Sequence, residues 1–168
     1  MASQSLVTFC NWLAATSFSR AVQTNGWVIP AVQTVHILAV AAVVTAALMI
    51  NLHLLGIRRD DQSVAAVAKR FLPFIWWPLP ALLATGAVLI VAEPARALEN
   101  PVFLLKMGLL LAAAGVTLAC QLPIRRNATF WELSSGRRRA AKLVAFVSIP
   151  LWIAIVCAGR WIAYVQGT

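Results

Sequence analysis

The stretch "WVIPAVQTVHILAVAAVVTAALMINLHLLGIRR", from Trp27 to Arg59, decides the fold. It carries no charged residue before Arg58. A helix of roughly 20 apolar residues is enough to cross the hydrocarbon core of a bilayer. The stretch also holds both histidines of the chain, His36 and His53. It therefore predicts a membrane-spanning helix that carries two titratable side chains.

The composition indicates a membrane protein throughout. Of the 168 residues, 61% are hydrophobic and 11% are charged, and the mean hydropathy is +0.83. Soluble domains are about half apolar and about a quarter charged. Cys10, Cys120 and Cys157 lie far apart and form no CxxC pair, which predicts neither a disulfide framework nor a zinc site. Motifs of soluble enzymes are absent, so we assign no reaction from sequence.

Four apolar segments are long enough to span a bilayer. They cover about 28–57, 71–93, 102–123 and 141–165. Backbone polar groups in lipid must be satisfied internally, so each segment should be a helix. The sequence predicts an all-α integral membrane four-helix bundle over residues 27–168. Pro73, Pro78 and Pro80 should mark the entry of the second helix or kink it.

The first 26 residues predict a short amphipathic helix that lies in the periplasmic interface. Its apolar residues recur at roughly helical spacing over residues 3–20; they are Leu6, Phe9, Cys10, Leu13 and Phe18. The segment does not have the pattern of a secretory signal, because its first positive charge, Arg20, follows the apolar part.

The distribution of basic residues predicts the orientation. The formal charge is +9, but the basic residues lie in short loops, so we expect no nucleic-acid partner. Ten of the 14 Lys and Arg follow the first and third segments: Arg58, Arg59, Lys69, Arg70, Arg125, Arg126, Arg137, Arg138, Arg139 and Lys142. The positive-inside rule then places these loops in the cytoplasm of a bacterial inner membrane, with both termini periplasmic.

Titratable residues at membrane depth are costly, so each one is a candidate for function. His36, Glu93, Lys106 and Arg160 come from four different helices and fall in one layer near the outer surface. His53 lies in the inner leaflet, because the helix rises by about 25 Å between the two histidines. The two imidazoles therefore cannot share one metal ion within a protomer.

Imidazoles near opposite faces of one helix predict one or two b-type haems, with His36 and His53 as iron ligands. The sixth ligand of the His36 site is Met107 or a residue of a second protomer, or the haem is five-coordinate. Cationic side chains would pair with the haem propionates: Lys106, Arg160 and Arg96 on the outer side, and Arg58 and Arg59 on the inner side.

Simpler interpretations of the same residues stay open. Each histidine can hydrogen-bond a neighbouring helix, and His53 can lie among the headgroups. Lys106 and Arg160 can extend along the helix toward water. An ion pair between Glu93 and either of these cations would only hold helices together.

Three stretches together carry a family resemblance. They are "IPAVQTVHILAVAAVVTAALMINLHLLGIRR" from Ile29, "AEPARALENPVFLLKMGLLLAA" from Ala92 and "AGRWIAYV" from Ala158. The chain resembles an uncharacterised family of small bacterial inner-membrane proteins, distantly similar to the copper-resistance D membrane proteins. The resemblance implies four membrane helices and supplies no reaction. His36 matches the family pattern, whereas His53 in "NLHLLG" stands where members carry arginine in "DLRLLG".

The leading hypothesis is a small b-type-cytochrome-like protein that carries electrons within or across the membrane, between quinone and a partner. One alternative is a non-redox accessory or assembly subunit of a larger complex. Another is a protein that handles copper or a small solute. A homo-oligomer or a larger assembly in the lipid bilayer is expected in each case.

Overall fold

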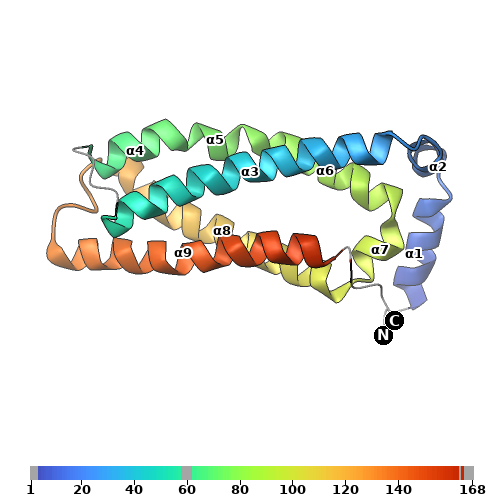
Figure 1. Cartoon of the computed structure of the whole chain (residues 1–168). Helices are drawn as coiled ribbons and strands as arrows, with labels where there is room; N and C mark the ends of the chain where they lie inside the picture. Colours follow the sequence, from blue (N-terminus) through green and yellow to red (C-terminus); the bar gives the residue numbers. More distant parts are fainter. Residues whose placement is uncertain (1–3, 58–61, 163, 165–168) are drawn as a thin grey trace. The chain divides into compact units, whose positions relative to one another are not determined.

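In a computed structural model, the structure describes residues 4–57, 62–162 and 164. These residues form helices and no strand, so the predicted all-α class is confirmed (Figure 1). The helices are α1 Gln4–Ala14, α2 Ser17–Thr24, α3 Val28–Leu55, α4 Val64–Phe71, α5 Pro73–Trp76, α6 Pro78–Ala92, α7 Pro94–Leu98, α8 Pro101–Arg126 and α9 Ser135–Trp161.

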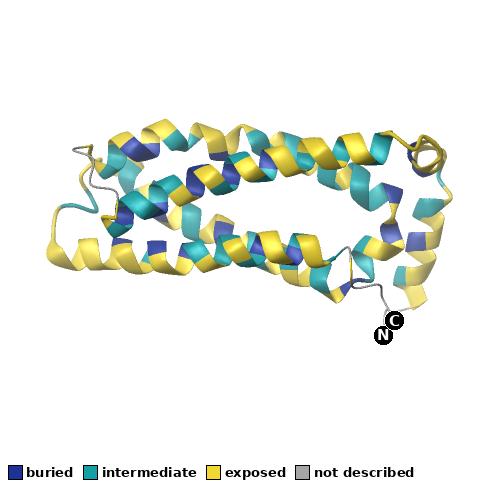
Figure 2. Ribbon diagram, viewed as in Figure 1, coloured by how far each residue is buried: buried dark blue, intermediate teal, exposed yellow. Residues whose placement is uncertain are grey.

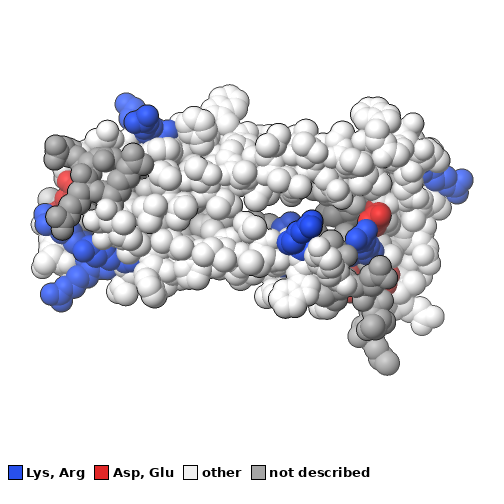
Figure 3. Space-filling view, viewed as in Figure 1, with Lys and Arg blue, Asp and Glu red and all other residues white. Residues whose placement is uncertain are grey.

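Within the described part of the chain, four helical stretches are long and apolar enough to cross a membrane. They are Val28–Leu55, Val64–Ala92, Pro101–Arg126 and Ser135–Trp161. Only 6% to 28% of the most apolar window of each is buried inside the protein. Their apolar side chains are largely exposed, and the face drawn in Figure 3 is mostly uncharged (Figures 2 and 3). Apolar surface of this extent suits lipid as solvent, so the prediction of a four-helix integral membrane protein is confirmed.

Two of the spans begin earlier than the hydropathy predicts. The second begins at Val64, where the Ser63 hydroxyl accepts a hydrogen bond from the Ala66 N–H at 3.2 Å. The fourth begins at Ser135, and the Ser134 hydroxyl accepts from the Arg137 N–H at 3.3 Å. Both serines satisfy a backbone donor that the first helical turn leaves free. Helix therefore continues into polar sequence that a hydropathy pattern does not register.

Prolines divide the second span rather than mark its entry. α4 ends before Pro73, which is the first residue of α5, and Pro78 is the first residue of α6. Proline has no N–H to give to the preceding turn, so each proline interrupts the ladder of helical hydrogen bonds, although Leu72 and Trp77 before them keep helical dihedral angles. By contrast, Pro123 and Pro150 lie inside α8 and α9 without ending them.

The N-terminal region forms two helices where the sequence predicts one over residues 3–20. Thr16 caps α2 by accepting from the Ser19 N–H at 3.3 Å, and this ends the continuity with α1. The Ser19 hydroxyl donates to the Val91 carbonyl at 2.8 Å, and the Gln23 amide donates to the Ala92 carbonyl at 2.6 Å. α2 is thereby fixed to the end of α6, while α1 packs against α7.

The chain divides into two compact units. The first unit is Met1–Ala41, Pro78–Met107 and Val156–Thr168; the second unit is Ala42–Trp77 and Gly108–Ile155. In the second unit, Leu54, Cys120, Ala141 and Ala145 form a buried apolar cluster. In this unit α3 ends at Leu55 and is followed by Gly56, whose φ of +75° is the left-handed conformation that closes many helices. The Gly56 N–H donates to the His53 carbonyl at 2.9 Å.

Candidate functional site

His36 is held by a neighbouring helix of the first unit. Its Nδ1 lies 2.8 Å from the hydroxyl oxygen of Thr85 on α6. The Thr85 hydroxyl donates its own proton to the Ala81 carbonyl at 2.5 Å, so its oxygen must accept from His36. Nδ1 therefore carries the imidazole proton, and Nε2 carries a free lone pair. The arrangement leaves one ring nitrogen available as a ligand.

Small residues border the side chains of this site. A Cβ added at Gly86 would lie 3.7 Å from Cε1 of His36, and one added at Gly159 would lie 3.6 Å from Nζ of Lys106. The Lys106 ammonium is near enough to His36 for the two groups to interact electrostatically. The structure therefore brings together His36, Thr85 and Lys106, and we call these three residues the His36 site.

The other predicted outer residues have partners of their own. Glu93 forms a salt bridge with Arg96 at 2.9 Å, one helical turn away, and both side chains are nearly half exposed. The alternative that Glu93 pairs with Lys106 or Arg160 is therefore not what the structure shows, because a nearer cation is available on α7. Arg160 donates to the hydroxyl of Tyr164 at 3.3 Å. Met107 is 43% exposed.

His53 lacks the support that His36 has. It is partly buried in the second unit, and its Nδ1 is buried without a hydrogen-bond partner among the described residues. Arg58 and Arg59, the predicted inner propionate partners, lie outside the described residues.

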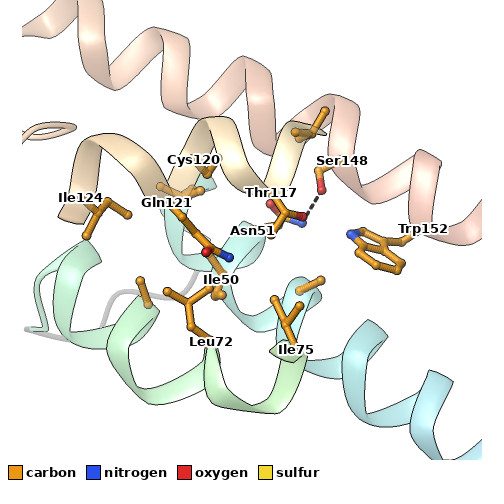
Figure 4. A pocket seen from close by; sticks show the side chains of 14 residues that line it. Ile50, Asn51, Leu72, Ile75, Thr117, Cys120, Gln121, Ile124, Ser148 and Trp152 are labelled. Carbon is orange, nitrogen blue, oxygen red and sulfur yellow. Dashed lines mark hydrogen bonds between the residues drawn. The ribbon is translucent and has the colours of Figure 1, made fainter. Parts of the chain in front are cut away.

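Buried uncharged polar side chains in the second unit were missed by the sequence prediction. Asn51 donates to the hydroxyl of Ser148 at 2.9 Å, and the indole of Trp76 donates to the amide oxygen of Gln121 at 3.2 Å. Asn51, Ser148 and Gln121 line a small cavity together with Trp152 (Figure 4). In the sequence, these residues are visible only as amide and hydroxyl side chains inside apolar runs. Such side chains are a weaker indication of a buried polar site than a charged residue is.

Cys10 is a buried thiol beside a larger cavity of the first unit. That cavity has a volume of about 470 Å³, and Cys10, Gln23 and Arg96 are among its lining residues. Burial, and then the Glu99 carboxylate, raise the pKa of Cys10. A thiol with a raised pKa stays protonated and is a poor nucleophile near neutral pH, so these surroundings do not activate Cys10.

These features define an α-helical protein of the multi-pass membrane type. One of its histidines, His36, is held in a fixed orientation by a hydrogen bond to Thr85. Within the described ranges, no three His, Cys, Asp or Glu side chains gather as a metal-binding group. The chain belongs to DUF6644, a family of unknown function that matches residues 9–165. Membership of an uncharacterised family is therefore confirmed. No curated protein and no solved structure matches the chain significantly.

Proposed function

We propose that this protein is a small b-type-cytochrome-like electron carrier of the bacterial inner membrane, with His36 as an axial ligand of haem. The observation that carries the proposal is the hydrogen bond from Nδ1 of His36 to Thr85. Metal-ligating histidines almost always donate their second ring N–H to an acceptor, which fixes the tautomer and aims the free nitrogen. His36 has such an acceptor in the Thr85 hydroxyl.

The residues of the His36 site fit an axial ligand and its surroundings. Thr85 holds the ring and keeps the proton on Nδ1, so that Nε2 can bind iron. The Lys106 ammonium supplies positive charge for a propionate, and Gly86 leaves the flank of the ring uncrowded. Bound haem would supply reversible one-electron chemistry at its iron.

A single haem at His36 is the form we favour. His53 has no acceptor for its Nδ1 among the described residues, so it lacks the second-shell contact that supports His36. Met107, which is 43% exposed, or a residue of a second copy of the chain would supply a further ligand if the iron takes one. Electrons would then pass between quinone and a partner protein.

Copper is the second metal that the same nitrogen would accept. Imidazole suits copper as well as iron, and the resemblance to copper-resistance D membrane proteins supports this alternative. The geometry of one histidine does not distinguish the two metals, so the test must measure both.

The test measures haem, iron and copper in purified wild-type protein and in two matched variants, His36→Ala and His53→Ala. We expect haem in the wild type and in His53→Ala, and its loss from His36→Ala, which should fold normally. Copper in place of iron would favour the copper alternative. Absence of haem and of both metals from the wild type would contradict the proposal and favour a non-redox accessory subunit.

A further inference from the structure

A small cavity in the second unit is bordered by polar groups that the proposed function does not use. Its volume is about 30 Å³, and apolar side chains such as Ile50, Leu72 and Ile75 form much of its wall. The polar residues on the wall are Asn51, Thr117, Gln121, Ser148 and Trp152 (Figure 4). None of the described lining residues is charged.

Two N–H donors at this cavity have no hydrogen-bond partner among the residues described. They are Nε2 of Gln121 and the indole Nε1 of Trp152, both buried. Gln121 is only 6% exposed, and its amide oxygen already accepts from Trp76, which turns the amide nitrogen the other way. Figure 4 shows the two nitrogens directed into the cavity, one from α8 and one from α9. Buried donors are rarely left unpaired, so we expect the cavity to hold a hydrogen-bond acceptor.

The same cavity also offers acceptors. The Thr117 hydroxyl donates to the Ala113 carbonyl at 2.8 Å, which leaves its oxygen lone pairs free. The Ser148 oxygen accepts from Asn51 and retains a second lone pair. A ligand that both accepts and donates hydrogen bonds would therefore pair with the unpaired donors and with the free oxygen lone pairs of this cavity.

We infer that this cavity is a binding site for internal water, which Gln121 of α8 and Trp152 of α9 hold by hydrogen bonds. A water molecule needs about 10–15 Å³ of such volume and two to four polar partners, so the cavity suits one or two molecules. Organic ligands need pockets of about 300–1,000 Å³, which excludes a quinone ring. An ion would be buried without a counter-charge on the wall.

The bound water gives the second unit a polar connection between α8 and α9. It accepts from Gln121 on α8 and from Trp152 on α9, and it donates to Thr117 or Ser148. This inference does not depend on haem, and its test is independent of the test of the proposed function.

The experiment is NMR of the full chain in detergent micelles, with ¹⁵N-labelled tryptophan. The indole signal of Trp152 is assigned by its disappearance in Trp152→Phe. In ordinary water we expect a cross-relaxation peak between this N–H and water, with the sign that a long-lived internal water molecule gives. Trp131 serves as the internal control, because its indole already donates to the Cys120 carbonyl at 3.2 Å.

Gln121→Leu removes one donor and should abolish or at least halve the water cross-peak of Trp152. Gln33→Leu is the matched control, since Gln33 is an exposed glutamine of the first unit and its loss should leave the signal unchanged. Thr117→Val, which keeps the side-chain shape, provides a second test if Gln121→Leu does not fold. A wild-type Trp152 indole without water contact, or in contact only with protons of a lipid-soluble molecule, would overturn the inference.

Discussion

The two histidines of α3 differ in what holds their rings. The Nδ1 of His36 donates to a hydroxyl on another helix, whereas the Nδ1 of His53 is buried with no partner in the described part of the chain. A ring whose tautomer is fixed presents a defined nitrogen to a ligand. For this reason His36 carries the proposed function and His53 remains a secondary prediction.

Replacing the acceptor of His36 should weaken haem binding without removing the ligand. In Thr85→Val the side chain keeps its shape, but the Nδ1–H of His36 loses its partner. Loss of such an outer contact costs about 10- to 100-fold in metal affinity. Titration of haem into the haem-free variant, followed by visible absorbance, measures this change.

Thr85→Ser is the control for that experiment, because it restores the hydroxyl and should return affinity close to the wild-type value. Equal affinities for wild type and Thr85→Val would show that Thr85 does not position His36.

The hydrogen bond between Asn51 and Ser148 should contribute measurably to stability. Both residues are buried, with 5% and 4% of their surfaces exposed, and the bond length is 2.9 Å. Interhelical bonds of this kind in membranes are worth about 0.6 kcal/mol on average and up to about 1.7 kcal/mol. A double-mutant cycle of Asn51→Ala and Ser148→Ala, with unfolding followed in mixed micelles, should give a coupling energy in this range. Strictly additive effects would count against the bond.

At the scale of elements, the contact of α6 with α3 depends on a small residue at Gly86. A Cβ at Gly86 would meet the His36 ring at 3.7 Å, which is an ordinary contact distance. Gly86→Ala should therefore bind haem like the wild type, whereas Gly86→Leu should displace the imidazole and lower the haem content.

The leucine side chain would overpack the contact, and overpacking lowers the free energy of unfolding by about 1–3 kcal/mol in well-packed sites. Gly115→Leu on α8 is the matched control, because a Cβ there has no neighbour within 4 Å. Haem content of the purified variants measures the difference. If Gly115→Leu lost as much haem as Gly86→Leu, the effect would be a general loss of stability.

The elements also show how far hydropathy alone predicts this fold. The four spans follow from long apolar runs, because lipid selects for such runs directly. Starts at Val64 and Ser135 were missed by several residues, because capped turns extend the helices into polar sequence. The partners of His36 and Gln121 were also missed. α3 is apolar on all faces, and its sequence does not show which face meets Thr85.

At the scale of the whole molecule, the basic loops predict a single orientation. Ala128 lies in the exposed turn between α8 and α9, near Arg125 and Arg126, and Gly26 lies between α2 and α3. The positive-inside rule predicts that the first position is cytoplasmic and the second periplasmic. A membrane-impermeant maleimide should label Gly26→Cys in intact cells and Ala128→Cys only in inverted vesicles.

The native cysteines make the wild-type chain a suitable control for this labelling. Cys10 and Cys120 are buried, and Cys157 is exposed on α9 but lies in a helix long and apolar enough to cross the membrane, so a polar reagent should modify none of them in the folded protein. Labelling of Ala128→Cys in intact cells would reverse the proposed topology.

The central claim is that His36 binds haem iron. The most direct measurement is the visible absorption spectrum of the purified wild-type protein, oxidised and reduced, beside that of His36→Ala. We predict a Soret band that shifts on reduction in the wild type and is absent from the variant. A folded wild-type protein without a Soret band, or a variant with the wild-type spectrum, would contradict the claim.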